Sequence, residues 1–450
     1  MVFIPNFHVK DQMLNGIDLE NIEKLFSDIP KDIRINKLNL PKGLSQQDVE
    51  RKLREIGKKN VSFYDMPSFL GGGVTPHFIP AVVKEVVSRS EFLTSYTPYQ
   101  AEASQGMLQS MFEYQSMICE LVGMDVANCS LYDGATAVGE AALMCHRVKN
   151  DKSCFIVARS VSWEKRSVLH NYVKGAGIKV VEAPFDGVGG KIDLEALSEL
   201  IDGNVCGVYI ETPNFFGVFE SDLKNIVDVV HDKGSLLVVG INPISLGTAI
   251  GPGELGADIV IGEGRSLGNA VSFGGSGLGI FACKNEFLRQ MPGRIIGMTK
   301  DRSGNRAFCM NFQTREQHIR RGRATSNICT NEGLNALAAV VFLSWLGGTG
   351  LWELSQVNMK KAQQCMKAVC NVDGFSRCFD SDFFNEFVVK SPIKIEELNK
   401  RLLDKGIIGG IDVGVWYPEL KDCLLFGISE MHSDEMIAVL ATTLDEVVNQ

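Results

Sequence analysis

Short apolar runs alternate with longer amphipathic stretches between residues 130 and 285. The runs are rich in β-branched residues and cover residues 154–158, 179–183, 205–210, 236–239, 258–261 and 279–282. Stretches with apolar residues at helical spacing separate several of them, at residues 135–148, 164–173, 194–200 and 223–232. Strands that are buried on both faces are continuously apolar, and their alternation with helices is typical of a mostly parallel sheet. The pattern therefore predicts a large α/β domain.

The regions on either side of this pattern differ from it. One amphipathic helix, capped by Ser45, is predicted at residues 46–57. The surrounding segment is charged and contains several prolines, and we interpret it as an N-terminal arm that packs on another part of the protein or on a partner. After residue 330 an apolar helix is predicted to end at Gly347-Gly348, and helices then alternate with short strands. Residues 286–330 are basic and are predicted to be irregular. We predict three parts: an N-terminal arm (1–70), a large α/β domain (71–330) and a smaller C-terminal α+β domain (331–450).

The totals exclude several classes of protein. Of the 450 residues 45% are hydrophobic and 22% charged, so the chain can build a large core and is not predicted to be disordered. The net charge of −9 argues against a dedicated nucleic-acid-binding or anionic-membrane-binding protein. The longest apolar run, residues 336–346, is shorter than the roughly 20 residues that span a bilayer. Because no signal peptide is visible either, we expect a cytoplasmic protein.

The cysteines indicate neither disulfides nor a metal site. The chain has 12 of them, without a CxxC pair and without the Cys–His spacing of a zinc site. Disulfide frameworks usually occur in short secreted chains, whereas this chain is long. We therefore expect reduced thiols, mostly in the core, and no bound metal.

Polar segments follow three of the predicted strands. They are residues 211–217, Asn242 and residues 262–268. Open α/β sheets bind ligands at the carboxyl ends of their strands, so these segments are predicted to line one cleft, although they are equally compatible with plain loops. Residues 133–136 open a helix whose amides suit a phosphate; ordinary capping is the simpler interpretation. The GxGxxG match at residues 251–256 precedes a strand instead of following one, so we interpret it as a turn.

Two further clusters have a functional and a structural interpretation. Between residues 315 and 323 the chain places four arginines and His318, which is consistent with an anion site, a subunit contact or a solvated charged face. The loop at residues 96–100 carries two tyrosines and a proline, which is typical of a recognition loop and also of a packed interface. His77 follows three glycines and is a candidate acid or base; a lone histidine is more often structural.

Several ordered motifs resemble one family, the P-protein of the glycine cleavage system. They are Ser90-Glu-Phe-Leu-Thr-Ser-Tyr-Thr-Pro-Tyr-Gln100, Tyr132-Asp-Gly-Ala-Thr136, Pro213-Asn-Phe-Phe-Gly217, Gln313-Thr-Arg-Glu-Gln-His-Ile-Arg-Arg321 and Ala324-Thr-Ser-Asn-Ile-Cys-Thr330. The resemblance is to the α subunit of the two-subunit form and extends from the N-terminal arm to the small domain. It implies the aminotransferase-like fold type I of pyridoxal-phosphate (PLP) enzymes.

The resemblance also implies an activity and partners. The P-protein decarboxylates glycine on PLP and passes the aminomethyl group to the lipoyl arm of the H-protein. In the two-subunit form, α and β subunits make an α2β2 tetramer, and the cofactor lysine belongs to the β subunit. The expected partners are therefore a β subunit, lipoylated H-protein and glycine, with no nucleic acid and no membrane.

The sequence departs from a PLP-binding pattern in two places. In fold type I enzymes, the Schiff-base lysine follows the strand that corresponds to residues 258–261. Here residues 262–268 contain no lysine, and Ser266 lies near the expected position. The aspartate that normally faces the pyridine nitrogen corresponds to Asn242, whose neutral amide cannot supply a negative charge. We therefore expect no cofactor on this chain.

Other departures and retained motifs suggest how such a subunit could still contribute. Ser162-Trp163 replaces a common His-Pro pair, and Pro76 replaces an aspartate before His77, which weakens an acid–base role for that histidine. The retained segments could complete the β subunit's site across the interface. The candidates are Tyr96, Tyr99, Gln100, Gln105, Arg320, Arg321 and His77. Two alternatives remain open at this point: a purely structural scaffold subunit, and a self-sufficient PLP enzyme with an unexpected lysine.

Overall fold

The structure, a computed structural model, describes residues 7–35, 37–93, 96–150 and 152–449. The chain divides into two compact units, Met1–Val61 and Ser62–Gln450. Among its described residues, 7–35 and 37–61, the first unit contains four short helices: η1 (Phe7–Val9), α1 (Lys10–Asn15), η2 (Ile22–Phe26) and α2 (Gln46–Gly57). The predicted helix at residues 46–57 is confirmed, and the Ser45 hydroxyl accepts a hydrogen bond from the Asp48 amide as its N-cap. The apolar face of α2 is exposed at Val49, Leu53 and Ile56.

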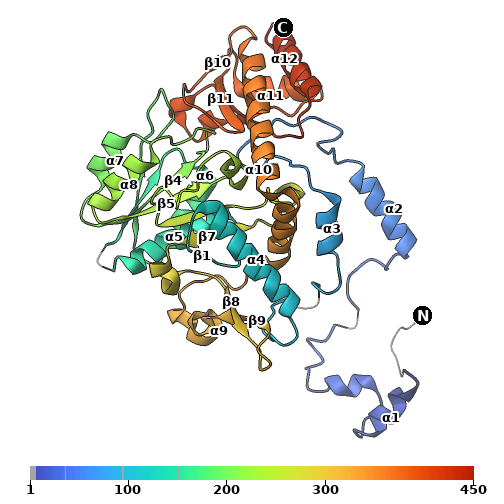
Figure 1. Cartoon of the computed structure of the whole chain (residues 1–450). Coiled ribbons are helices and arrows are strands. Elements are labelled where there is room, and N and C mark those ends of the chain that lie inside the picture. The colour runs from blue at the N-terminus through green and yellow to red at the C-terminus, as the bar shows by residue number, and fades with distance from the viewer. Residues whose placement is uncertain (1–6, 36, 94–95, 151, 450) are drawn as a thin grey trace. The chain divides into compact units, whose positions relative to one another are not determined.

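The second unit is built on a seven-stranded sheet (Figure 1) with the order β1-β7-β6-β5-β4-β2-β3. Strands β2 to β6 are mutually parallel, whereas β7 and β1 run antiparallel to their neighbours. The strands are β1 (Val126–Ala127), β2 (Cys154–Ala158), β3 (Lys179–Ala183), β4 (Val205–Thr212), β5 (Leu236–Ile241), β6 (Ile259–Glu263) and β7 (Gly279–Cys283). Strands β2, β4 and β5 are buried almost throughout, which explains why their sequences are continuously apolar.

Helices connect and cover these strands. They are α3 (Ala81–Val87), α4 (Gln105–Val122), α5 (Gly134–Val148), α6 (Trp163–Lys174), α7 (Leu194–Leu200) and α8 (Leu223–Asp232), with short 3-10 turns η3 (Pro243–Gly247), η4 (Ser272–Gly274) and η5 (Asn285–Gln290). The predicted strands and helices between residues 130 and 285 are confirmed to within a few residues at each end. The segment at residues 251–256 forms a turn before β6, as predicted.

The prediction of irregular structure for residues 286–330 was wrong in part. A two-stranded antiparallel ribbon forms there from β8 (Ile295–Lys300) and β9 (Arg306–Asn311), followed by η6 (Gln313–Arg315), α9 (Gln317–Arg320) and η7 (Arg321–Arg323). Only the start of β8 is buried, and the far end is exposed and charged, so the strand lacks the continuous apolar run of the large sheet. The ribbon packs on α4, which supplies the burial that the local sequence does not reveal.

The C-terminal part forms a smaller α+β domain. Its antiparallel sheet has the order β10-β11-β13-β12, and α11 and α12 pack together beside it (Figure 1). The elements are β10 (Ser376–Arg377), β11 (Glu386–Lys390), α11 (Ile395–Asp404), β12 (Ile411–Asp412), η8 (Val413–Val415), η9 (Pro418–Leu420), β13 (Cys423–Gly427) and α12 (Asp434–Val448). Phe69 lies in the core of this domain, so the unit that contains it begins before the predicted end of the arm at residue 70.

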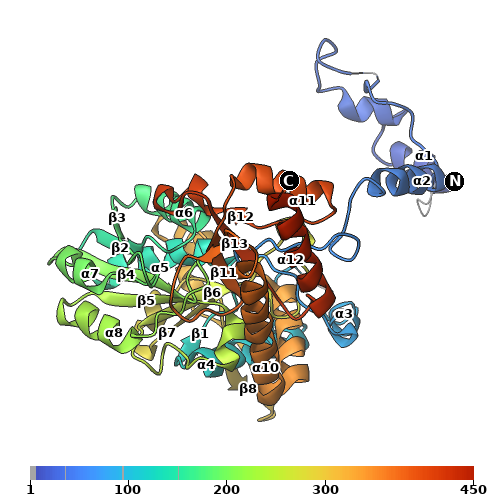
Figure 2. The same ribbon diagram turned by 90° about the horizontal axis from the view of Figure 1, so that it is seen from above.

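Helix α10 (Gly333–Cys370) links the two domains and packs beside α12 (Figure 2). The predicted break at Gly347 is confirmed, because this residue has φ 63° and ψ −178° inside the helix. By length and composition alone the helix could cross a membrane. However, Ala339 and Phe342 belong to the core of the large domain and Ala362 and Cys365 to the core of the small one. We therefore interpret α10 as a core helix that ties the domains together.

Candidate functional site

The carboxyl ends of the central strands bring the predicted polar segments to one edge of the sheet. Glu211 in β4 pairs with Gly240 in β5, and Ile241 in turn pairs with Gly262 in β6. Residues 211–217, Asn242 and residues 262–268 therefore leave the sheet side by side, as the strand-end rule predicts. The start of α5 joins this edge, since the Gly134 amide contacts β6.

The Glu263 side chain occupies the start of α5. One carboxylate oxygen, Oε2, accepts a hydrogen bond from the Gly134 amide at 3.0 Å. The other, Oε1, accepts from the amides of Arg265 and Leu278, both at 2.9 Å. Asp133 caps the same helix and forms a reciprocal capping box with Thr136, which confirms the capping interpretation of residues 133–136. The positive end of the helix thus already has a negative partner from its own chain.

An ion pair between half-buried Lys165 and buried Glu211 lies at the end of β4. The Lys165 ammonium, from the first turn of α6, lies 2.5 Å from Glu211 Oε1, and the Tyr209 hydroxyl donates to the same oxygen at 2.6 Å. Glu211 is 5% exposed. Burial by itself would lower the pKa of Lys165, but the Glu211 carboxylate outweighs it and the pKa is raised. Lys165 is therefore held as an ammonium, a form that is not nucleophilic.

The residues expected at the cofactor positions have local roles. The Asn242 side chain accepts a hydrogen bond from the Ile244 amide at 3.1 Å and so caps η3. Ser266 lies half-buried in the turn after β6, in the loop that contains no lysine. Trp163 stacks on Trp416 of the small domain, with ring centroids 4.8 Å apart and planes at 11°. Asn242 and Trp163 therefore each have a partner within the chain.

The glycine-rich loop before His77 closes over the same region. The Gly73 amide donates a hydrogen bond to Glu386 Oε1 at 2.9 Å, and the Gly73 carbonyl accepts one from Arg265 Nη2 at 3.1 Å. Glu386 is 7% exposed, and its burial raises the pKa of the carboxyl to about 7. Lys165 opposes this shift and Glu211 adds to it. Glu386 consequently changes charge in the physiological range.

We predict that Glu386→Gln removes a pH dependence of stability. The pKa is about 4.5 in the unfolded chain and about 7 in the folded one, so folding favours the protonated carboxyl. Its contribution is therefore present below about pH 4.5 and is lost as the pH rises toward 7, by on the order of 3 kcal/mol. The amide of the variant keeps an acceptor for Gly73 and does not ionise. The free energy of unfolding in urea is measured for both proteins at about pH 5 and about pH 8. Relative to wild type, the variant should be more stable at the higher pH than at the lower one. An equal difference at both pH values would contradict this prediction.

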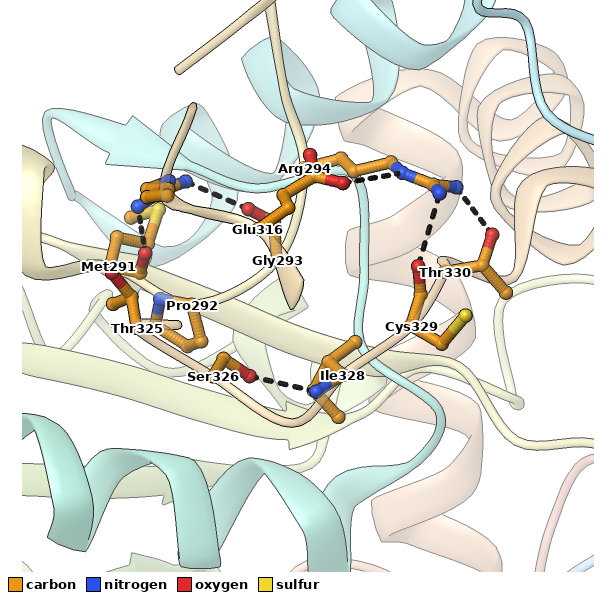
Figure 3. A pocket seen from close by; sticks show the side chains of 11 residues that line it. Met291, Pro292, Gly293, Arg294, Glu316, Thr325, Ser326, Ile328, Cys329 and Thr330 are labelled. Carbon is orange, nitrogen blue, oxygen red and sulfur yellow. Dashed lines mark hydrogen bonds and ion pairs between the residues drawn. The ribbon is translucent and has the colours of Figure 1, made fainter. Parts of the chain in front are cut away.

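A second cluster centres on Arg294, at the start of β8 (Figure 3). Its side chain is 5% exposed, and Nη2 donates to the Cys329 carbonyl at 3.0 Å and to the Tyr99 hydroxyl at 3.2 Å. Nη1 donates to the Thr330 hydroxyl and, at 3.3 Å, to that of Thr97. Glu316 Oε2 lies 3.8 Å from Nε. One guanidinium thus joins the aromatic loop at 96–100 to the segment at 313–330.

The cluster around Arg294 borders a pocket, and further hydrogen bonds to the backbone hold the residues that line it. Arg315 donates to the carbonyl of Gly293 at 2.7 Å and also to that of Met291. The Cys329 amide donates to the Tyr132 hydroxyl at 2.8 Å, which ties the segment to the residues just before α5. Beneath the loop Glu140 is fully buried, and this burial raises the pKa of its carboxyl. The motif at residues 313–330 therefore has a fixed base and an exposed outer rim.

The predicted site residues fall into three groups. Five of them are exposed, and we call this set the exposed rim: Tyr96, Tyr99 and Gln100 of the aromatic loop with Arg320 and Arg321 of the motif at 313–330, with Tyr96 at 82% and Tyr99 at 52% exposure. Gln105 instead joins α4 to the ribbon, because its side chain donates to the Phe308 carbonyl and accepts from the Phe308 amide. His77 is buried beside the small domain, with Nδ1 2.9 Å from Glu430 and Nε2 3.2 Å from Thr75. The structural interpretation of His77 therefore fits its surroundings.

The sequence reasoning missed three residues that organise these sites: Arg294, Glu263 and Lys165. Arg294 lies next to apolar residues and near Pro292, and a charge in such a context is a signal for a buried, paired side chain. Glu263 lies inside the segment that was predicted to line the cleft, but its partner Gly134 is 129 residues away. Lys165 follows its cap Ser162 in a charged helix start and has no distinguishing local pattern.

Two comparisons of sequence show what the chain resembles. The family model described as "Glycine cleavage system P-protein" matches residues 3–444. A protein of Thermococcus kodakarensis named probable glycine dehydrogenase (decarboxylating) subunit 1 is 47% identical over 450 residues, covering 100% of this chain and 98% of that one. A protein of the same name from Pyrococcus furiosus is 46% identical over 449 residues, with 99% of each chain covered.

Solved structures agree with these matches. A crystal structure of glycine decarboxylase (P-protein) of the glycine cleavage system, in inhibitor-bound form, has a TM-score of 0.92 and 37% identity, covering 99% of this chain and 100% of that one. The cysteine desulfurase CsdA of Escherichia coli has a TM-score of 0.62 at 15% identity, covering 85% and 95%, and is evidence for the fold alone. The predicted aminotransferase-like fold of PLP enzymes is confirmed. Matched in sequence and fold along nearly its whole length, the chain belongs to the glycine cleavage system P-protein family.

Proposed function

We propose that this chain is the α subunit of a two-subunit glycine decarboxylase. With a β subunit that carries PLP, it would form a cytoplasmic α2β2 enzyme that releases CO2 from glycine and transfers the aminomethyl group to the lipoyl arm of H-protein. Its relatives are named subunit 1, which supports a partner chain. The cofactor supplies the electron sink for decarboxylation. On this proposal the chain is inactive alone and binds no PLP or metal.

The observation that carries this proposal is the state of the lysines at the sheet edge. No lysine lies in residues 262–268, and the lysine that does reach the edge, Lys165, is paired with Glu211 at 2.5 Å. A Schiff base requires a neutral amine, whereas this pairing raises the pKa of Lys165. Asn242 adds a second argument, since its neutral side chain caps η3 and cannot stabilise a protonated pyridine ring.

The first experiment incubates the purified chain with PLP, reduces it with borohydride and searches for a pyridoxyl-lysine peptide. We expect no stoichiometric label, and we expect glycine decarboxylation only after the β subunit is added. A stoichiometric label on any lysine, including Lys165, would overturn the proposal and favour a self-sufficient PLP enzyme. The same chain after mock reduction without PLP serves as the control for nonspecific modification.

We further propose that the exposed rim formed by Tyr96, Tyr99, Gln100, Arg320 and Arg321 completes the β subunit's site. The arginines could pair with a carboxylate or phosphate, because a guanidinium offers a planar set of donors. Tyr99 is already oriented, since its hydroxyl accepts from Arg294 and its ring lies 5.5 Å from that guanidinium. Tyr96 has no such anchor among the described contacts and is 82% exposed.

Variants of the rim distinguish this role from a purely structural scaffold. Arg321→Ala and Tyr96→Phe are each combined with the β subunit, and both assembly and the rate of decarboxylation are measured. We expect a loss of rate of at least about tenfold with the tetramer intact, equivalent to about 1.4 kcal/mol. Arg302→Ala, in the exposed turn of the ribbon, is the matched control and should keep the full rate. Full activity of both rim variants would leave the scaffold interpretation.

A further inference from the structure

The carboxylate of Glu263 receives backbone donors from three separate segments. Gly134 begins α5, Arg265 follows β6, and Leu278 precedes β7, yet their amides converge on one side chain at 2.9–3.0 Å. Convergent amides at a helix start are the usual protein device for holding a phosphate or carboxylate. In this chain the anion is covalently part of the protein.

Two glycines lie against Glu263. A Cβ added at Gly277 would lie 2.9 Å from Glu263 Oε2, and one added at Gly134 would lie 3.1 Å from the Glu263 amide nitrogen. Both distances are shorter than ordinary van der Waals contact. The two glycines thus let the start of α5 and the segment before β7 approach Glu263 closely.

A positive charge lies within electrostatic reach of the same place. Glu263 is one of the carboxylates that raise the pKa of Lys165, although the larger influences on that lysine are its burial and Glu211. The Glu211 ion pair and the Glu263 hydrogen bonds therefore form one charged lining at the carboxyl ends of β4 and β6. Removal of Glu263 would leave the amides of Gly134, Arg265 and Leu278 without their acceptor, while Lys165 would keep Glu211 and the start of α5 would keep Asp133.

We infer that Glu263 is a built-in anion that fills the anion position formed by the start of α5 and the amides of Arg265 and Leu278, and keeps it closed to phosphate ligands. It replaces the stabilisation that a bound phosphate would give to the start of α5. The inference deepens the proposal that this chain carries no cofactor and rests on it for its biological meaning. Whether Glu263 occupies an anion site is tested with phosphate, independently of the labelling experiment with PLP.

The test uses the full-length chain and inorganic phosphate as the probe. Wild type, Glu263→Ala and Glu353→Ala are melted in chloride and in phosphate at equal ionic strength, and phosphate binding is titrated by calorimetry. Glu353 is an exposed glutamate on α10 and serves as the control for loss of one charge. We expect Glu263→Ala to melt lower in chloride, to recover in phosphate and to bind one phosphate per chain. Wild type and Glu353→Ala should show no saturable binding.

The remaining outcomes also decide the matter. Equal phosphate binding by wild type, or no binding by folded Glu263→Ala, would overturn the inference. If Glu263→Ala folds in neither buffer, Glu263→Gln decides: its amide fills the space without the charge, so it should melt below wild type equally in both buffers. A Glu263→Gln protein as stable as wild type would overturn the inference. A pyridoxyl-lysine peptide from wild type would instead refute the proposed absence of cofactor, whatever the phosphate result.

Discussion

Arg294→Ala is expected to destabilise the chain by on the order of 3 kcal/mol. The side chain is 5% exposed, and its guanidinium contacts three hydroxyl groups, the Cys329 carbonyl, the Asn331 side-chain oxygen and the Glu316 carboxylate. Removing one partner of a buried ion pair leaves the other charge uncompensated, which typically costs about 3–5 kcal/mol. The Cys329 carbonyl also loses its donor, and an unpaired buried polar group adds to the cost. Urea unfolding of the isolated chain measures the loss directly.

Arg294→Lys separates charge from geometry. A lysine keeps the positive charge but lacks the planar fork that reaches both Tyr99 and Cys329. It should therefore recover part of the stability, while the Tyr99 loop becomes more exposed to proteolysis or hydrogen exchange than in wild type. The exposed Arg302→Ala provides the baseline for loss of an arginine. A change below about 1 kcal/mol for Arg294→Ala would show that the cluster does not depend on this residue.

The strands of the large sheet could be predicted because their buried residues are consecutive in the sequence and apolar. Strands β2, β4 and β5 are apolar along their whole length, and the helices between them have caps and spacing that a short window detects. The ribbon of β8 and β9 could not be predicted in this way. Its stability comes from α4, which lies almost two hundred residues earlier, and from Gln105 in particular.

The candidate site was predictable in position and not in its contacts. The strand-end rule correctly places Glu211, Asn242 and residues 262–268 at one edge. What occupies that edge depends on pairs such as Glu263 with Gly134 and Lys165 with Glu211, which are far apart in sequence. Local spacing contains no information on such pairs. That residues 262–268 contain no lysine was visible in the sequence, whereas the carboxylate at the start of α5 required the fold.

Gly217→Ala is expected to have the largest effect on stability. Gly217 ends the loop after β4 with φ +83°, and a Cβ there would lie 1.8 Å from the carbonyl oxygen of Glu386 in β11. The loop cannot simply withdraw, because the Gly217 carbonyl accepts a hydrogen bond from the Phe384 amide of the small domain at 3.0 Å. The substitution must therefore separate the loop from the small sheet, for which we expect a loss of more than about 4 kcal/mol.

Gly177→Ala distinguishes this clash from backbone strain. Gly177 has a similar φ of +68°, yet nothing lies within 4 Å of a Cβ added there. The free energy of unfolding of Gly177→Ala should therefore fall only by the penalty for an alanine in the left-handed conformation, about 1–2 kcal/mol. The difference between the two variants in urea unfolding measures the close approach of the large domain to β11. Equal losses would mean that the loop after β4 can move away from Glu386, and that the carboxyl edge of the sheet is not held against the small domain at this point.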